Sequence, residues 1–229
     1  MRFLCIDTSG ETAIAFVDGR DVLAGARDES ARHHTESITP LVRRVLADAG
    51  VPEPLTSDAL DAVAVGTGPA PFTGLRAGLV SARIIARAAG VPVYGASSLD
   101  VLARQALDRL PSDSEVVVAS DAKRKEVYWA RYRAKGPDDV EAIAGPDVAA
   151  PEKMLNALRS GDIDAELAMP EAFRPPALEG VGRIGLPELD AAVLARLVAA
   201  RLSRGLTADD MGTEPLYLRR PDIQGQPRG

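Results

Sequence analysis

The stretch RFLCIDTSGETAIAFV, residues 2–17, decides how this chain begins to fold. Its two short apolar runs, residues 2–6 and 12–17, are separated by polar residues and a glycine, a pattern typical of a β-hairpin. A third strand is predicted over residues 21–27. The chain therefore opens with three consecutive strands.

Beyond these strands the chain alternates between helices and strands. From His33 the apolar residues take up the period of one helix face, which continues to Ala49 and ends at Gly50. A strand, a helix, a strand and a helix are then predicted at residues 61–66, 75–89, 91–95 and 98–110. This alternation implies parallel pairing and a mixed sheet with helices packed against it.

The second half repeats the pattern more weakly. Strands are predicted at residues 115–119 and 126–133, and helices at residues 150–161 and 188–204. Residues 169–187 are rich in proline and glycine, so we expect a loop-rich segment with few regular elements there. The tail after Thr213 is expected to be extended or frayed.

Charge and composition exclude several classes of function. The 229 residues include 27 Lys and Arg against 33 Asp and Glu, a net charge of −6. An acidic chain is a poor candidate for binding nucleic acid by itself, because such affinity comes from clustered cations. The two histidines, His33 and His34, are adjacent, so no two-histidine zinc motif of the HExxH kind exists.

The remaining composition favours a cytoplasmic protein with an inert thiol. Cys5 is the one cysteine and lies in an apolar run, where a buried thiol is more common than a nucleophile. Asp7 interrupts that run, so no secretory pattern opens the chain. No apolar run approaches the ~20 residues that a membrane span requires.

Two polar segments could carry chemistry. In a kinase-like site Asp7 would hold Mg²⁺ through water while the hydroxyls of Thr8 and Ser9 approach a phosphate. Spacing alone favours a simple hairpin turn at these positions. Asp121 holds the equivalent place in the second half, but Ala122 stands where a phosphate loop needs glycine for close backbone approach.

The loop at residues 66–74 leads into the predicted helix 75–89. Amides at a helix start attract anions, but the loop has neither the GxGxxG nor the GxxxxGK[ST] pattern, and its prolines stiffen it. An anion site and a stiff structural loop are both open alternatives for these residues.

The helix at residues 75–89 has apolar residues over most of its surface and one polar stripe at Arg76, Arg83 and Arg87. A protein interface and packing within the chain are equal explanations for the surplus apolar surface.

Five motifs together resemble a known family. They occur in this order along nearly the whole chain: CIDTS at 5–9, HHTE at 33–36 followed by Pro40-Leu41, GTGPAPFTGLRAG at 66–78, SDAKRKEVY at 120–128, and PLYLR at 215–219. The pattern is similar to that of the bacterial TsaB (YeaZ) family of tRNA threonylcarbamoyladenosine biosynthesis proteins. Ala70-Pro71 replaces the Gly-Ser of the family's GPGSFTGLR loop, which stiffens the loop further.

The resemblance implies an α/β, two-lobed, actin-like ASKHA fold with ribonuclease-H-like halves, the second of them degenerate. Residues 1–104 would form the N-terminal lobe, joined by a return helix at 188–206. Residues 105–187 would form the degenerate lobe, and residues 207–229 an extended tail.

The resemblance also implies a function without catalysis by this chain. Such proteins are similar to inactive paralogues of TsaD, the catalytic subunit, which they bind alongside a TsaE-like ATPase, so that tRNA is reached only through the complex. The resemblance implies that this chain has no metal, no catalytic residue and no cofactor of its own. It allows ATP or ADP at the interface with the partner complex, and it allows a homodimer of the free chain. No membrane is involved.

Specific positions follow from the same resemblance. Two groups are implied. The partner interface would comprise Ile38, Leu41, Val45, Leu75, Leu79, Val80 and Arg83. The degenerate phosphate-loop positions would be Asp7, Thr8, Ser9 and Asp121.

The sequence speaks against two other functions. The first is an active ASKHA phosphotransferase that uses Asp7 and Asp121 around Mg-ATP; the missing glycine after Asp121 and the absence of a clear adenosine-binding glycine motif in Val181–Gly185 speak against it. The second is a peptidase, as the family's old "glycoprotease" label suggests, but the sequence offers no candidate nucleophile or metal set.

Overall fold

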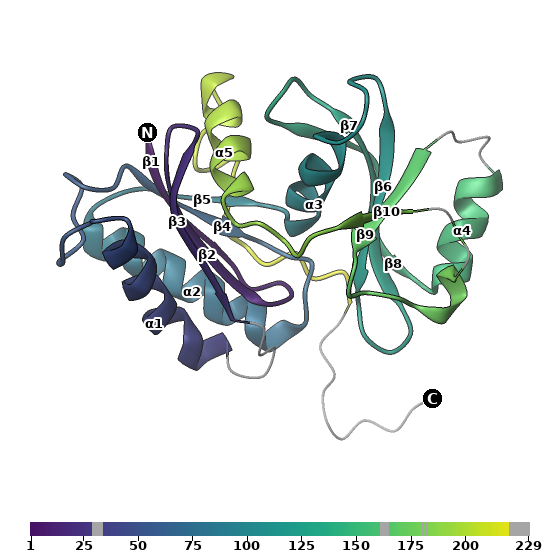
Figure 1. Cartoon of the computed structure of the whole chain (residues 1–229), viewed down its shortest axis with the longest axis horizontal. Coiled ribbons are helices and arrows are strands. Elements are labelled where there is room, and N and C mark those ends of the chain that lie inside the picture. Colours follow the sequence, from purple (N-terminus) through teal and green to yellow (C-terminus); the bar gives the residue numbers. More distant parts are fainter. Residues whose placement is uncertain (29–33, 161–164, 180, 182, 220–229) are drawn as a thin grey trace.

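The fold consists of two lobes, each built on a five-stranded sheet (Figure 1). The computed structural model describes residues 1–28, 34–160, 165–179, 181 and 183–219. His33, where the predicted helix pattern began, lies outside these residues. No helix in the described part of the chain is long and apolar enough to cross a membrane.

The first sheet has the strand order β3-β2-β1-β4-β5. Its strands are β1 (Arg2–Asp7), β2 (Thr12–Asp18), β3 (Asp21–Asp28), β4 (Ala62–Gly66) and β5 (Val93–Ala96). The first three pair antiparallel, as the hairpin pattern predicts, and β4 and β5 add parallel to β1. Strand β1 is central and almost fully buried because both faces of this sheet are covered by helices.

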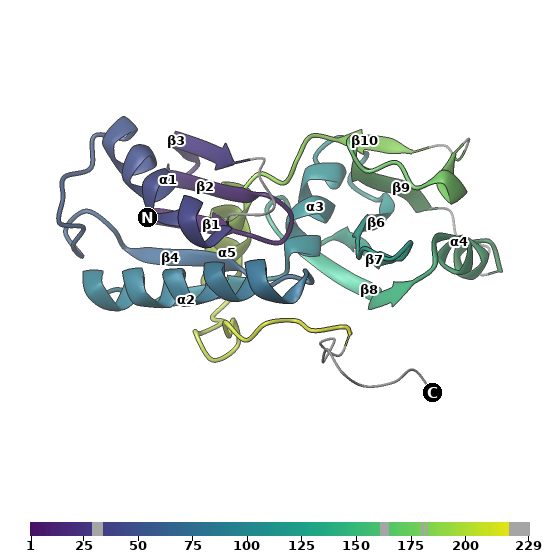
Figure 2. The ribbon, with the colours of Figure 1, turned by 90° about the horizontal axis from the view of Figure 1, so that it is seen from below.

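Two helices cover the outer face of the first sheet: α1 (His34–Asp48) and α2 (Phe72–Ala89). Figure 1 shows them side by side beneath the strands, and Figure 2, seen from below, shows α1 against β2 and β3 with α2 next to β4. Helix α2 begins at Phe72 rather than at the predicted Leu75, because Thr73 and Gly74 belong to its first turn. It ends as expected: Gly90 takes the left-handed conformation (φ 71°), and its N–H donates to the carbonyls of the last turn.

The second sheet repeats the first. Its strands are β6 (Glu115–Asp121), β7 (Val127–Ala134), β8 (Val140–Ala149), β9 (Ala165–Pro170) and β10 (Ile184–Leu186), in the order β10-β9-β6-β7-β8. Three antiparallel strands again precede two parallel ones. Helix α4 (Pro151–Ser160) takes the place of α1, but the short 3₁₀ helix η1 (Pro176–Leu178) stands where the first lobe has α2. This is the two-lobed α/β fold of ASKHA type with a reduced second half.

Three strands of the second sheet were not predicted. Strand β8 is an edge strand with an exposed middle, and Gly145-Pro146 interrupts it, so it lacks an apolar alternation. Strand β9 is short and follows a weak helix pattern. Strand β10 has only three residues and lies in the segment 169–187, where the prediction of few regular elements otherwise describes the chain well.

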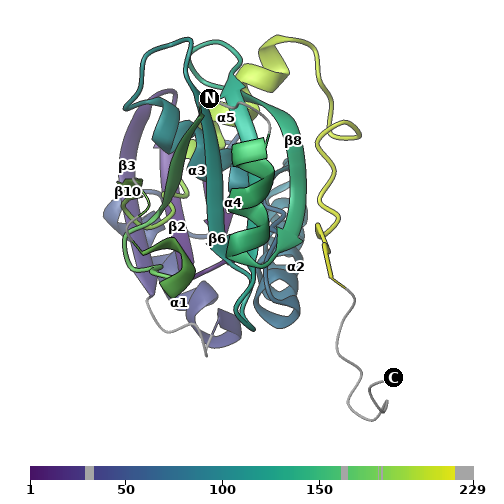
Figure 3. The ribbon, with the colours of Figure 1, turned by 90° about the vertical axis from the view of Figure 1, so that its right-hand side faces the viewer.

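The last helix of each half crosses to the sheet of the other half. Helix α3 (Ser98–Leu107) packs against all five strands of the second sheet, whereas α5 (Val193–Ser203) packs against β1, β4 and β5. The two helices also contact each other between the lobes (Figures 1 and 3). One apolar core therefore spans both lobes, with Phe3 and Val116 among its fully buried members.

Charged side chains reinforce this junction around Asp139, which is 3% exposed. Arg201 of α5 lies 2.9 Å from Asp139 and 2.7 Å from Asp100 of α3, and Arg204 also pairs with Asp139. Arg104 of α3 donates to the Asp139 carbonyl at 3.1 Å. The turn between β7 and β8 is thus held against both crossing helices.

Replacement of Asp139 should destabilise the fold more than replacement of a surface aspartate. In Asp139→Ala the largely buried Arg201, whose side chain is 14% exposed, loses one of its two carboxylate partners, and we expect a loss of about 3–5 kcal/mol in the free energy of unfolding. Asp48→Ala, which removes an exposed partner of Arg44, serves as control and should change it by about 0–1 kcal/mol. Urea denaturation measures both, and equal losses in the two variants would contradict the role assigned to Asp139.

The junction should also respond to acid through Asp108. Partial burial alone would raise the pKa of this carboxyl, but hydrogen bonds and charge from Arg196 and Arg104 hold the pKa below its ordinary value. Because the folded pKa is depressed, the stabilisation is complete above the unfolded value of about 3.9 and is lost as pH falls through the folded pKa. Melting temperatures of the native chain and Asp108→Asn should therefore differ at pH 6 and converge below pH 4; a constant difference would show that Asp108 does not titrate this way.

Candidate functional site

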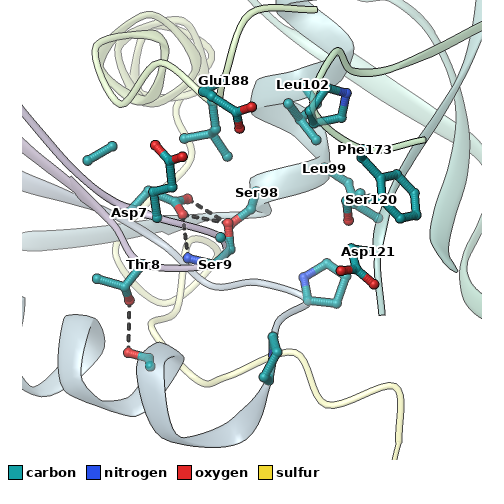
Figure 4. A pocket seen from close by; sticks show the side chains of 18 of the residues that line it. Asp7, Thr8, Ser9, Ser98, Leu99, Leu102, Ser120, Asp121, Phe173 and Glu188 are labelled. Atoms are coloured by element: carbon teal, nitrogen blue, oxygen red, sulfur yellow. Dashed lines mark hydrogen bonds between the residues drawn. The ribbon is translucent and has the colours of Figure 1, made fainter. Parts of the chain in front are cut away.

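A cleft of about 570 Å³ lies between the two lobes (Figure 4). Its walls come from the ends of β1 and β6, the loop before α2, the start of α3 and the segment before α5. All four predicted phosphate-loop positions, Asp7, Thr8, Ser9 and Asp121, line it. The structure thus brings together residues that are more than a hundred positions apart in the sequence.

Asp7 is buried at the end of β1, and its carboxylate is occupied by this chain's own donors. Oδ1 accepts hydrogen bonds from the backbone N–H of Ser9 at 2.7 Å and from its hydroxyl at 2.6 Å, and Oδ2 accepts one from the Ser98 hydroxyl at 2.7 Å. A Cβ on Gly66 would lie 1.8 Å from Oδ2, so only glycine fits there. Asp7 therefore joins β1 to α3 beside β4.

Thr8 is likewise used inside the chain. Its hydroxyl donates to the Gly74 carbonyl at 2.9 Å, in the first turn of α2. A Cβ on Gly78 would lie 2.2 Å from that hydroxyl oxygen, so glycine is required one turn further along. Thr8 fixes the start of α2 against β1, as the bond to the helix in Figure 4 shows.

Asp121 faces the cleft from the second lobe and is paired with Lys123. Its Oδ1 accepts the Lys123 N–H at 2.7 Å, and its Oδ2 lies 2.6 Å from the Lys123 ammonium. The remaining charged lining is acidic, since Asp7, Glu11 and Glu188 also border the cleft. Anionic walls of this kind repel the phosphates of a nucleotide unless a cation is bound with it.

Metal and thiol chemistry find no support in the described part of the chain. Among the described residues no group of three His, Cys, Asp or Glu side chains is placed to hold a metal ion. Burial raises the pKa of the Cys5 thiol well above its ordinary value, so the thiol stays protonated.

A second candidate site is the outer face of α2. Of the seven predicted interface residues, five are core residues that hold α1 and α2 on the first sheet. These are Ile38, Leu41, Val45, Leu75 and Leu79, each between 0% and 9% exposed. The structure thus corrects their assignment, because the apolar period of each helix is taken up by the sheet.

The exposed apolar residues of α2 form a ridge instead. Val80 is 52% exposed and Ile84, one turn further along, is 61% exposed. Arg83 lies beside them on the surface. Val80 and Arg83 are among the predicted interface residues. Ile84 is not, although its spacing of four from Val80 places both on one face of the helix.

The tail runs along α2 toward the second lobe (Figures 2 and 3). Arg83 binds the hydroxyl and carbonyl oxygens of Thr213 at 2.8 and 2.6 Å, and Arg76 donates to the Tyr217 hydroxyl at 2.7 Å. The ring of Tyr217 stacks on that of Phe72, 5.2 Å between centroids. The tail was expected to be extended or frayed. These contacts show that Arg76 and Arg83, two arginines of the polar stripe, bind it to the surface of α2.

Comparisons with known proteins agree with this architecture. The family model described as "TsaD: tRNA N6-adenosine threonylcarbamoyltransferase" matches residues 28–211. An uncharacterized protein of Mycobacterium bovis is 40% identical over 226 residues, which cover 96% of this chain and 93% of that protein.

Two further relatives have informative names. The "tRNA threonylcarbamoyladenosine biosynthesis protein TsaB" of Haemophilus influenzae is 30% identical over 229 residues, covering 96% of this chain and 94% of that protein. The solved structure "YeaZ from Pseudomonas aeruginosa" matches with a TM-score of 0.71 at 27% identity, over 95% of this chain and 99% of that chain. The chain belongs to the TsaB (YeaZ) family of tRNA threonylcarbamoyladenosine biosynthesis proteins.

Proposed function

We propose that this chain is a non-catalytic subunit of the machinery that makes tRNA threonylcarbamoyladenosine, and that it binds and supports a TsaD-like catalytic subunit. The observation that carries this proposal is the ridge of Val80 and Ile84 on α2. Large apolar side chains exposed one helical turn apart lose solvent-exposed area only when another molecule covers them.

The geometry of α2 supports a helix as the partner's contacting element. On one side of the ridge the arginine stripe is held by the tail, and on the other side α2 packs beside α1. This leaves an apolar strip along the helix axis between two walls. A helix of the partner laid along such a strip buries both side chains at once.

The family to which the chain belongs also suggests the other members of the complex, namely a TsaE-like ATPase, tRNA and a nucleotide. A TsaE-like ATPase would be met through the TsaD-like subunit, which would also bring this chain to tRNA. ATP or ADP would bind at the interface with the partner complex rather than in the cleft. Two observations support a non-catalytic role for the cleft itself: both oxygens of its central carboxylate, Asp7, accept hydrogen bonds from internal donors, and its walls are acidic.

An active phosphotransferase is the second candidate. One observation favours it, since Asp7 and Asp121 approach the same cleft from opposite lobes, as a Mg-ATP site of this fold would require (Figure 4). The two candidates differ in what Asp7 does, because a structural Asp7 affects stability and a catalytic Asp7 affects turnover.

The ridge can be tested with a charge substitution. Val80→Glu should strand a carboxylate in a dry contact and weaken binding of the TsaD-like subunit by several kcal/mol, about 100-fold or more in Kd. The melting temperature of the free chain should hardly change, because Val80 is exposed there. Calorimetric titration and thermal melting of the same variant give both numbers.

The matched control is Val22→Glu, the same change at a 57%-exposed valine on the edge strand β3. It should leave both affinity and melting temperature close to those of the native chain. Unchanged binding by Val80→Glu, or an equal loss in Val22→Glu, would remove α2 from the interface.

The cleft can be tested with isosteric substitutions. Asp7→Asn removes the charge that three hydrogen bonds address, and we expect it to lower the free energy of unfolding by about 1.5–3 kcal/mol. Asp121→Asn, which changes a carboxylate at the rim of the cleft, should have a smaller effect. The purified chain should show no appreciable ATP hydrolysis. Robust turnover abolished by both variants would instead establish the phosphotransferase.

A further inference from the structure

The turn between β6 and β7 has an unusual backbone. Lys123, Arg124 and Lys125 have φ values of 61°, 55° and 62°, so three consecutive residues adopt the left-handed conformation. Residues that have a Cβ atom adopt the left-handed backbone conformation rarely and at an energetic cost, whereas glycine adopts it freely. None of the three positions is a glycine, and all three are basic and exposed.

The surrounding contacts hold this conformation in place. The Ala122 N–H donates to the Glu126 carbonyl at 3.1 Å, and the Glu126 N–H donates to the Lys123 carbonyl at 3.0 Å. From the tail, Arg219 donates to the Ala122 carbonyl at 3.3 Å and pairs with the Glu126 carboxylate. A backbone that is costly for these residue types and yet braced from both sides is characteristic of functional positions.

The local charge is opposite in sign to that of the whole chain. The turn and its brace carry four cations, Lys123, Arg124, Lys125 and Arg219, against the carboxylates of Asp121 and Glu126, while the chain carries a net −6. Asp121 is paired with Lys123 and Glu126 with Arg219. Lys125 makes no side-chain ion pair or hydrogen bond with the described residues.

A small hollow of about 180 Å³ lies next to the turn. It is lined by Lys123, Arg124 and Arg219 together with the rings of Phe72 and Tyr217. Three cationic side chains around one concave surface suit an anionic group on a flexible chain, and the stacked rings form a rigid wall beside it.

We propose that the β6–β7 turn and this hollow bind the phosphate backbone of RNA directly. A polyanion with a charge at every residue satisfies several cations of one short turn at once, and backbone phosphates require no base-specific geometry. The acidic remainder of the chain restricts the contact to this turn, so the chain alone should bind weakly and without sequence preference. That the RNA is a tRNA rests on the proposed function; the phosphate site does not.

The test uses the full chain, an unmodified tRNA transcript and fluorescence anisotropy across a range of salt concentrations. Lys125→Gly should raise Kd about threefold to tenfold and reduce the slope of log K against log salt by about one, as expected for one lost phosphate contact. Its melting temperature should stay equal or rise, because glycine relieves the left-handed position. Lys125→Arg keeps the charge and should retain binding.

The matched control is Lys153→Ala, which removes the same charge from the exposed surface of α4 and should leave Kd and the salt slope unchanged. Equal RNA binding by Lys125→Gly and the native chain would overturn the proposal. So would loss of binding to the TsaD-like subunit with RNA binding intact, because the turn would then dock an acidic protein surface. The proposed binding of a TsaD-like subunit has its own test, the affinity of Val80→Glu, because that substitution on α2 does not alter the residues of this turn.

Discussion

The structure depends on one buried carboxylate. Asp7 ends the central strand of the first sheet, accepts three hydrogen bonds and requires a glycine at Gly66 to make room for it. A carboxylate at such depth is tolerated only when its oxygens are satisfied, so Ser9 and Ser98 are fixed by it. Because Ser98 opens α3, which covers the second sheet, the position of Asp7 also sets how the two lobes meet.

The same constraint supports the non-catalytic role proposed for the cleft. A catalytic aspartate in a phosphate loop needs oxygens that remain available to water or metal. Here the neighbouring Thr8 is also committed, to the first turn of α2, and Gly78 accommodates it. The loop that could have approached a phosphate instead fastens β1 to two helices. Asp7 and Thr8 lie where a phosphate loop would place them, but their hydrogen bonds go to Ser9, Ser98 and Gly74 of this chain.

The difference between the two halves explains why the proposed partner surface lies on the first lobe. Both sheets have the same strand order, but α2 spans 18 residues, and its counterpart η1 has three. The sequence could predict the first half well because long apolar periods mark α1 and α2. Helical period shows which residues share a face but not what covers that face. Leu75 and Leu79 were therefore assigned to a partner although the sheet buries them, and Ile84 was overlooked.

The strands β8, β9 and β10 and the held tail escaped prediction for a related reason. They are short or exposed, and each depends on contacts with residues far away in the sequence, which a local pattern does not contain.

The tail links the two surfaces that the molecule presents. It is fastened at Arg83 beside the apolar ridge, at Phe72 through the stacked ring of Tyr217, and at the β6–β7 turn through Arg219. Exposed ion pairs of this kind contribute little individually. Most of the stability of the tail's attachment must therefore come from the ring stack and from a backbone hydrogen bond, 2.8 Å long, that the Leu216 N–H donates to the Thr67 carbonyl. These contacts join the tail to α2 at one end and to the second lobe at the other. The partner proposed to cover the ridge would remove water from the Arg83 contacts and strengthen them. The same segment contacts the left-handed turn through Arg219, so a single stretch of chain borders both the helix that carries the ridge and the basic turn.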